Sequence, residues 1–435
     1  MNRTLVVLLL LFVAAVPAFG ADSVFRTPYS PLLSEDERVA GLSRIWSEAK
    51  FGFVYFDRLP GLDWDALYLS YLPHVKAATS TAAYYRLLTR FVAELKDGHS
   101  SVTPPPEVQQ QLFGEPALRL GDFEGHVVVT DVFDPALGIA RGTELVAVDG
   151  IPVRQFAAER VTPYQSASTP QDLAVRTWRQ LLWGAEGSEV ELTLADAKGP
   201  ERRQAVRRLT AAEEQKITPV RVPFELRMLP GNVAYVALNE LADARAADAF
   251  DANFDAIAKA DALIVDIRLN GGGSSSVGHR VLAALTAKPF LAARSTTRLY
   301  NATARAWGEP EQIAVHEPEI VPPDGKRLFT KPVVVLTSAK TFSAAEDFAM
   351  AFDAMKRGTI IGEPTGGSTG QPLSFELPGG GSARVCTKHD TYPDGKEFVG
   401  VGIQPQVLVR PTLADLRAGK DTVLDAAMAY LKSRR

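Results

Sequence analysis

Apolar residues recur at helical spacing in the first quarter of the chain. Residues 34–53 begin with Ser34 and Glu37, the spacing of a capping box, and continue with apolar residues three and four positions apart. Two further helices are predicted over residues 64–75 and 81–95, and Gly98 is a natural breaker after the last of them. Residues 21–102 are therefore expected to form a small helical domain.

From residue 106 the pattern changes to short strands. Alternation predicts a strand over residues 125–133 and a hairpin over 188–209, with a helix over 169–184 between them. Asp149 and Gly150 have the sequence of a tight turn between two short strands. The piece GIARGTELVAVDGIPV resembles part of a PDZ domain, so a PDZ-like domain is expected over residues 106–212. No glycine-flanked carboxylate-binding loop precedes His126, so a peptide-binding role and a purely structural role both stay open.

From about residue 215 to 435, strands alternate with helices. Strongly apolar strands are expected at 231–241, 261–268, 332–338 and 358–365, and helices at 246–260, 276–286 and 343–357. This order predicts a mainly parallel sheet flanked by helices. Because chemistry in such sheets lies beyond the carboxyl ends of the strands, three segments are expected to share one edge: LNGGGSS, LTSAKTFS and GEPTGGSTG.

Composition excludes several classes of function. The 435 residues carry a net charge of −4, and Lys and Arg form no basic stripe, so no nucleic-acid partner is expected. Cys386 is the only cysteine, which excludes a disulfide within the chain. The six histidines are dispersed without ligand spacing, so neither a metal nor another cofactor is predicted.

Residues 1–20 have the plan of a secretory signal peptide. Arg3 precedes an apolar run over residues 5–16, and small residues follow at Ala18 and Gly20. The run is short for a membrane span, and no later segment has eighteen unbroken apolar residues. The mature protein is expected to be exported, periplasmic or secreted, without a stable membrane anchor.

Ser343 is the residue with the clearest chemical interest. It follows a buried strand and precedes a helix, and Glu346 stands three residues later. Ser343 could cap the helix, with Glu346 completing a capping box. It could also be a nucleophile, because the N-terminus of a helix stabilises the negative charge that develops during attack on a carbonyl. Both roles place the serine at the same position, so the sequence alone does not separate them. The glycines at 271–273 likewise fit either a tight turn or backbone donors aimed at an oxyanion.

Four segments in this order resemble one serine peptidase family: DALIVDIRLNGGG, TSAKTFSAAEDFAMAF, GEPTGGSTGQ and FVGVGIQPQ. That family comprises the C-terminal processing peptidases (tail-specific proteases), the tricorn protease core and the interphotoreceptor retinoid-binding protein modules. The resemblance implies an α/β catalytic domain of ClpP/crotonase-like fold over residues 215–435, behind the helical and PDZ-like domains.

The resemblance also implies roles for individual residues. Ser343 falls on the nucleophile, and the backbone N–H groups of Ala344, Gly271 and Gly272 fall on the oxyanion hole. Ser368 stands where processing peptidases carry a lysine base, so that dyad is absent. The tricorn-like branch uses a histidine before the PDZ-like domain, and His99 takes that place. Val399 occupies the position of the supporting glutamate. Glu397 lies two residues upstream on a predicted strand, so it is expected to face the same side and is one candidate to support His99 instead. Glu346 is the other candidate.

We therefore expect the protein to be an exported serine endopeptidase that hydrolyses peptide bonds in peptide or protein substrates. Ser343 forms an acyl-enzyme, and His99 serves as the general base. One alternative is a non-catalytic protein of the same fold that binds a peptide or an apolar ligand. The other is an acyl hydrolase or a crotonase-like acyl-CoA enzyme, which the PDZ-like segment disfavours.

Overall fold

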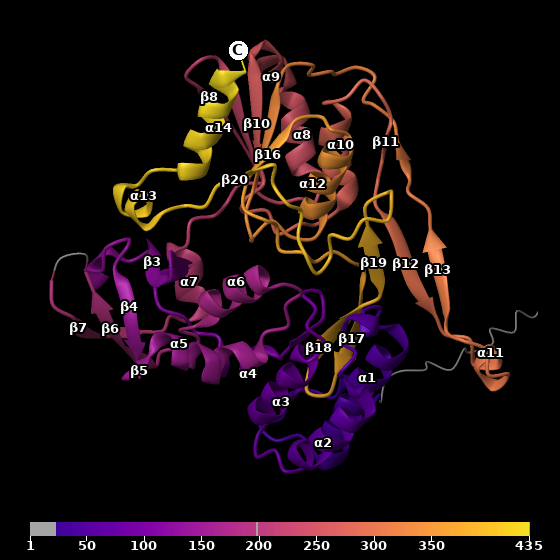
Figure 1. The fold of residues 1–435 in the computed structure, drawn as a ribbon. Helices are drawn as coiled ribbons and strands as arrows, with labels where there is room; N and C mark the ends of the chain where they lie inside the picture. Colours follow the sequence, from indigo (N-terminus) through magenta and orange to yellow (C-terminus); the bar gives the residue numbers. More distant parts are fainter. Residues whose placement is uncertain (1–22, 197–198, 435) are drawn as a thin grey trace, which may run out of the picture.

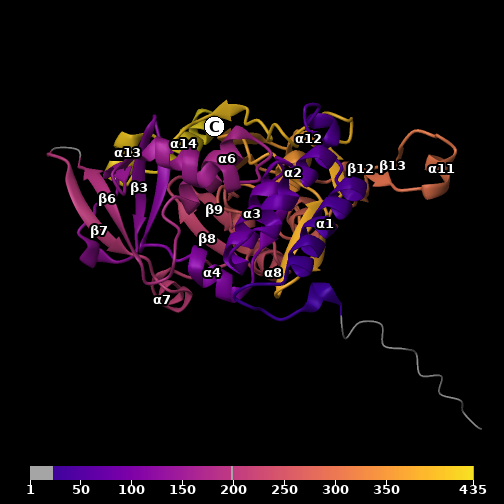
Figure 2. The same ribbon diagram turned by 90° about the horizontal axis from the view of Figure 1, so that it is seen from below.

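The computed structural model describes residues 23–196 and 199–434, so the predicted signal peptide lies outside the described residues (Figures 1 and 2). The N-terminal part consists of helices α1 (Glu35–Gly52), α2 (Trp64–Lys76) and α3 (Thr81–Ala93). The capping box that opens α1 is confirmed, since the Glu37 amide donates to Ser34 Oγ (3.3 Å) and the Ser34 amide to the Glu37 carboxylate (2.7 Å). All three predicted helices of this part are confirmed.

Gly98 does not end α3, contrary to the prediction from its sequence. The helix stops at Ala93, and the residue with positive φ in the following turn is Lys96. A Cβ atom at Gly98 would lie 2.8 Å from the Phe342 ring and 2.9 Å from Ser368 Oγ. Glycine is needed at this position because the C-terminal part of the chain packs directly against it.

The middle part forms an antiparallel sheet. Its strand order is β2–β3–β4–β6–β7, β5 pairs with β4, and positive φ at Asp149 and Gly150 makes the predicted tight turn. Helix α6 packs against β2, and this part has a hydrophobic cluster of its own. The bounds are α4 (Pro106–Leu112), β2 (Leu118–Phe123), β3 (His126–Val132), β4 (Glu144–Val148), β5 (Ile151–Pro152), α5 (Val153–Phe156), α6 (Pro170–Gln180), β6 (Glu189–Ala195), β7 (Arg202–Arg207) and α7 (Ala211–Ile217).

The C-terminal part contains the predicted, mainly parallel sheet. Its strand order is β20–β16–β15–β10–β9–β8, and only the pair β8/β9 in this order is antiparallel. The bounds are β8 (Phe224–Leu229), β9 (Val233–Leu238), α8 (Arg245–Ala252), α9 (Phe254–Lys259), β10 (Ala262–Asp266), α10 (Ser275–Ala283), β15 (Val333–Thr337), α12 (Ala344–Ala354), β16 (Thr359–Gly362), β20 (Val407–Leu408), α13 (Leu413–Ala418) and α14 (Thr422–Ser433).

Helices cover both faces of this sheet, as Figure 1 shows. Alternate residues of β15 enter different hydrophobic clusters: Val333 and Val335 pack with α8, α10 and α12, whereas Val334 and Leu336 pack with α14. The single helix predicted over residues 246–260 is wrong, because α8 and α9 meet at Asn253, whose ψ of 5° is not helical. The apolar spacing carries on across this break, so the pattern alone did not reveal it.

Three smaller sheets complete the fold, with the strand orders β1–β18–β17, β11–β14 and β13–β12–β19. Strand β1, which begins two residues after His99, pairs antiparallel with β18, and α1–α3 share one hydrophobic cluster with the helices of the C-terminal part. Strands β12 and β13, with α11 at their tip, project from the body (Figure 2). The bounds are β1 (Ser101–Thr103), β11 (Phe290–Leu291), β12 (Arg294–Leu299), α11 (Ala302–Ala306), β13 (Gln312–His316), β14 (Ile320–Val321), β17 (Pro372–Leu377), β18 (Gly381–Cys386) and β19 (Lys388–Thr391).

Candidate active site

Ser343 lies on a sharp turn between β15 and α12. Its φ of 56° and ψ of −130° fall where residues with a side chain are rarely found, a strain that is typical of functional turns. The turn is held by neighbouring strand ends, since the Phe342 amide donates to the Asn270 carbonyl and the Ser343 amide to the Ser368 carbonyl, both at 3.0 Å. The carboxyl ends of β10, β15 and β16 therefore meet at this residue, at the edge predicted from the sequence.

The imidazole of His99 faces the Ser343 hydroxyl. Nε2 lies 3.0 Å from Ser343 Oγ, and the ring stacks on Phe342 with a centroid separation of 4.8 Å and an interplanar angle of 13°. Only 5% of His99 is exposed, so the ring cannot turn away into solvent without displacing its neighbours. The structure thus brings together two residues that are 244 positions apart in the chain.

The other nitrogen of the His99 ring contacts Ser368. Nδ1 lies 2.8 Å from Ser368 Oγ, and Ser368 is fully buried. When Nδ1–H donates to this hydroxyl, Nε2 carries a lone pair toward Ser343, which is the tautomer that a general base requires. The residue in the position of the missing lysine is therefore a direct partner of the histidine.

Hydrogen bonds from two parts of the molecule hold the short loop that carries His99. The Asp97 carboxylate accepts from the His99 amide (3.1 Å) and from the Ser100 hydroxyl (2.7 Å). Ser166 accepts from the Asp97 amide (3.2 Å), and Arg176 donates to the Gly98 carbonyl (3.1 Å). Asp97 was not among the residues singled out from sequence, although an acid two residues before a histidine is an elementary turn signal.

Burial sets the charge state of His99. Desolvation, with smaller repulsion from Arg384, Arg176 and Lys388, lowers the pKa of His99 to about 3. Burial also raises the pKa of Asp97 to about 6, although the Ser100 hydroxyl and the His99 amide pull in the opposite direction. His99 is therefore neutral near pH 7 and able to accept a proton.

Glu346 holds the active-site loops rather than the histidine. It is fully buried, and its carboxylate accepts from the Thr365 hydroxyl (2.5 Å) and from the amides of Gly367 (2.7 Å), Ser368 (2.8 Å) and Ser343 (3.3 Å). Burial raises the pKa of Glu346 to about 8, against the lowering effect of these donors. The carboxylate thus ties the start of α12 to the loop that carries the partner of His99.

Glu397 lies away from the His99 ring. Its carboxylate accepts from Arg58 (2.7 Å) and lies 2.9 Å from His389 Nε2, and its side chain is 48% exposed. The structure therefore does not bring Glu397 to the histidine that it was expected to support. Glu397 lies in a loop after β19, where strand alternation does not fix the direction of a side chain.

The candidate oxyanion donors differ in how they are used. The Gly272 amide donates to Asn270 Oδ1 (2.8 Å), so this N–H group is already paired. The amides of Gly271 and Ala344 find no acceptor among the described residues. Gly272 instead fills a steric role, since a Cβ atom there would lie 2.6 Å from Ser343 Cβ.

No group of three or more His, Cys, Asp or Glu side chains in the described part of the chain is arranged to hold a metal ion. Among residues 23–196 and 199–434, no helix has the length and apolar character needed to cross a membrane.

Comparisons with known proteins agree with this architecture. The model of peptidase family S41 matches residues 232–409. A tricorn protease homologue from Streptomyces coelicolor is 26% identical over 95% of this chain and 34% of its own length. A chloroplastic carboxyl-terminal-processing peptidase from Arabidopsis thaliana is 25% identical over 75% of this chain and 62% of its own length. The chain therefore spans less than two thirds of either relative.

A solved structure shares the fold at low sequence identity. Mature CPAF complexed with lactacystin superposes with a TM-score of 0.69, at 16% identity, over 92% of this chain and 97% of that one. The similarity therefore extends over the helical, middle and α/β parts together.

Proposed function

We propose that this chain, whose residues 232–409 match the model of peptidase family S41, is a serine endopeptidase acting through an acyl-enzyme on Ser343. The observation that carries this proposal is the contact between Ser343 Oγ and His99 Nε2 at 3.0 Å, at a strained turn preceding a helix. A serine that served only to cap the helix would not need a buried neutral histidine facing its hydroxyl.

In the proposed reaction, His99 Nε2 takes the hydroxyl proton as Ser343 Oγ attacks the peptide carbonyl. The resulting oxyanion is stabilised by the N–H groups of Ala344 and Gly271. His99 then returns the proton to the leaving amine, which breaks the peptide bond and leaves an ester on Ser343. Water attacks this ester with His99 again as the base, releasing the new carboxylic acid and restoring the serine.

Ser368 acts on the reaction through His99. Its hydroxyl accepts the Nδ1–H hydrogen bond and so keeps the lone pair on Nε2. Unlike a carboxylate, it brings no negative charge to the imidazolium that forms during attack. Ser368 is therefore a positioning residue, and the site is expected to work with a weaker base than a Ser-His-Asp arrangement provides.

We also propose that the protein has three domains and is exported. The catalytic part, residues 215–435, has a ClpP/crotonase-like fold, residues 21–102 form the helical domain, and residues 106–212 form a PDZ-like domain beside it. Residues 1–20 direct export to the periplasm or the medium and are then removed. Amino-terminal sequencing of the protein recovered from each cell fraction tests the export and the cleavage together.

One observation favours a second function, that of a non-catalytic protein binding a peptide or an apolar ligand. No carboxylate contacts the His99 ring among the described residues, and the pKa of the ring is low. The two functions differ in a simple assay of unfolded casein digestion, followed by mass spectrometry. A peptidase yields new peptide ends that are missing from a Ser343→Ala digest, and identical digests from both proteins would favour the binding function.

A further inference from the structure

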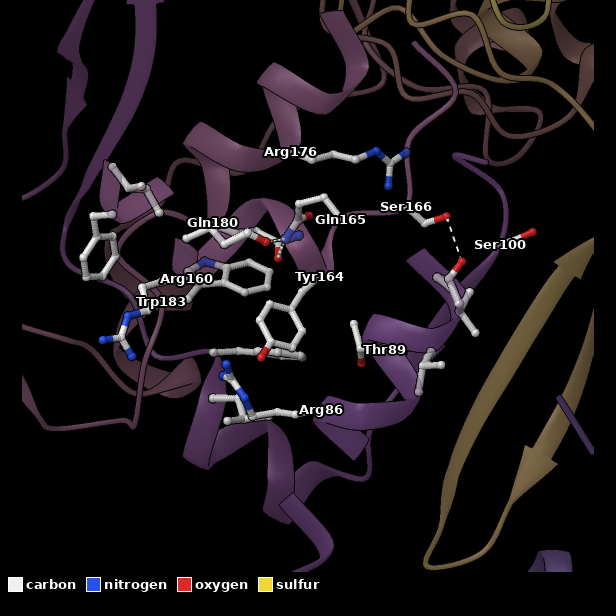
Figure 3. Close-up of a pocket in the computed structure, with 18 of the residues that line it drawn as sticks. Arg86, Thr89, Ser100, Arg160, Tyr164, Gln165, Ser166, Arg176, Gln180 and Trp183 are labelled. Atoms are coloured by element: carbon white, nitrogen blue, oxygen red, sulfur yellow. Dashed lines mark hydrogen bonds between the residues drawn. The ribbon is translucent and has the colours of Figure 1, made fainter. Parts of the chain in front are cut away.

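A cavity of about 620 Å³ lies outside the catalytic residues (Figure 3). Its walls come from α3 and β1 on one side and from the end of α4 and residues 149–183 of the middle part on the other. The volume is within the range of pockets that hold small molecules. Neither Ser343 nor His99 lines it, so it is a separate site between two parts of the molecule.

Most of the cavity wall is apolar. Val92, Val161 and Leu181 are buried at its wall, and four aromatic side chains also line it: Phe113, Phe156, Tyr164 and Trp183. Aromatic and aliphatic walls of this kind stabilise the apolar body of a ligand by removing its surface from water.

The polar side chains of the cavity are dominated by guanidinium groups. Arg86, Arg160 and Arg176 come from three different segments and are labelled in Figure 3. Arg176 pairs with Asp172 at 2.7 Å, whereas neither Arg86 nor Arg160 pairs with a carboxylate of the described residues. Arg86 lies over the Tyr164 ring, 4.4 Å from its centroid. Asp149 is the only acid in the lining, so the cavity carries an excess of positive charge.

We infer that this cavity binds a small apolar acid, with its aromatic or aliphatic body against the apolar wall and its carboxylate at Arg86 and Arg160. A guanidinium group matches a carboxylate in shape and can donate two parallel hydrogen bonds to it. A neutral apolar molecule of the same size would make the same apolar contacts but would leave these donors to water. The inference goes beyond the proposed peptidase activity and does not depend on it.

The cavity shares a wall with the loop that carries His99. Ser166 and Arg176 line it, and the same two residues bond to the backbone of Asp97 (2.7 Å from Ser166 Oγ to the carbonyl) and of Gly98 (3.1 Å). A ligand that contacts these two side chains would therefore shift the loop that carries His99. Its binding is expected to change the reactivity of Ser343.

Calorimetric titration of the full chain tests the site. The Ser343→Ala variant is titrated with 4-phenylbutanoate and, as its neutral counterpart, with 4-phenylbutan-1-ol. Saturable binding of the acid is expected, with affinity at least about tenfold higher than that of the alcohol, since a charge-assisted pair is lost with the alcohol. Equal affinities, or no saturable binding of the acid, would overturn the inference.

Arginine variants then locate the binding. Arg86→Gln and Arg160→Gln are each expected to weaken binding of the acid about tenfold, because each removes one guanidinium from the carboxylate. Arg90→Gln is the matched control, since Arg90 is an exposed arginine of the same helix α3 that does not line the cavity. Both cavity arginines are exposed, so folding should persist and is checked by circular dichroism. Equal binding by all three variants would place the acid elsewhere.

The effect on His99 has its own measurement, which rests on the proposed function. The rate at which a fluorophosphonate modifies Ser343 in the wild-type protein is compared with and without saturating 4-phenylbutanoate. A changed rate is expected, and the acid concentration that produces half of this change should be about tenfold higher in Arg86→Gln. An unchanged rate despite calorimetric binding would contradict the coupling to His99. A protein that is never modified would contradict the peptidase function without affecting the binding result.

Discussion

At the scale of single residues, the His99 ring is held between two hydroxyl groups. Ser343 Oγ lies 3.0 Å from one ring nitrogen and Ser368 Oγ lies 2.8 Å from the other. Ser368 can fix the tautomer of the ring, but it cannot offset the charge that the ring gains during attack on the substrate. Loss of the hydrogen bond between Ser368 and His99 should therefore lower the rate of catalysis without abolishing it.

Replacing Ser368 with alanine is expected to lower kcat about tenfold with little change in KM. A neutral hydrogen bond contributes about 0.5–1.5 kcal/mol, and about 1.4 kcal/mol corresponds to a factor of ten in rate. Nitrogen-15 spectra of the His99 ring should also shift toward a mixture of tautomers. Thr369→Ala is the control, because it removes a buried hydroxyl of the neighbouring residue that bonds to Asp390 and not to the ring. A normal tautomer in Ser368→Ala would count against the positioning role.

The low pKa of His99 predicts an unusual pH dependence. Below its pKa the ring is protonated and cannot act as a base, so a pKa of about 3 leaves it active throughout pH 5–7. A histidine with the ordinary pKa of about 6.5 would lose roughly thirtyfold in rate at pH 5. Asp97 also titrates in this range, with a pKa of about 6, so the rate of Ser343 modification is measured in Asp97→Asn. A decline centred near pH 6.5 in that variant would refute the shifted pKa.

At the scale of elements, the strand ends were predictable and the loops beyond them were not. The apolar strands, the glycine turn and the serine before a helix placed Ser343 and Gly272 at one sheet edge. Alternation and helical spacing say nothing of a side chain on an irregular loop, which is why Glu397 was expected at the histidine and lies at Arg58 instead. The bond from Ser368 to His99 likewise depends on the path of the loop after β16.

The glycine turn after β10 offers a comparison between neighbours. Gly272 has φ of 101° and no room for a Cβ atom, whereas a Cβ at Gly271 would meet nothing within 4 Å. Gly272→Ala is expected to lower the free energy of unfolding by about 1–3 kcal/mol from backbone strain alone, and to abolish modification of Ser343. Gly271→Ala should keep a nearly normal melting temperature. Equal free energies of unfolding of Gly272→Ala and Gly271→Ala would show that the turn accepts a Cβ atom at Gly272.

At the scale of the whole molecule, the site is assembled from all three parts of the chain. The helical part supplies His99, the middle part holds its loop through Ser166, and the C-terminal part supplies Ser343. The pairing of β1 with β18 fixes the first to the third. The sequence indicated that a histidine from one part meets a serine from another, but not these contacts, because they join residues with no shared periodicity.

Loss of the Ser166 hydroxyl is expected to slow catalysis from a distance. Ser166→Ala removes both hydrogen bonds to the Asp97 backbone, which should lower kcat about tenfold and the free energy of unfolding by about 1–3 kcal/mol. Ser188→Ala is the control, since its hydroxyl bonds within the middle part only. If Ser166→Ala and Ser188→Ala have the same kcat and the same free energy of unfolding, the middle part does not hold the histidine.

The pairing of Ser343 with His99 is tested most directly by labelling the purified protein with a fluorophosphonate, beside Ser343→Ala and His99→Ala. We predict labelling of the wild-type protein at Ser343, none in Ser343→Ala, and at least about a hundredfold slower labelling in His99→Ala, as expected when a general base is lost. Circular dichroism of each variant shows that it is folded. Labelling of His99→Ala at the wild-type rate, or no labelling of the wild-type protein, would contradict the roles of His99 as general base and Ser343 as nucleophile.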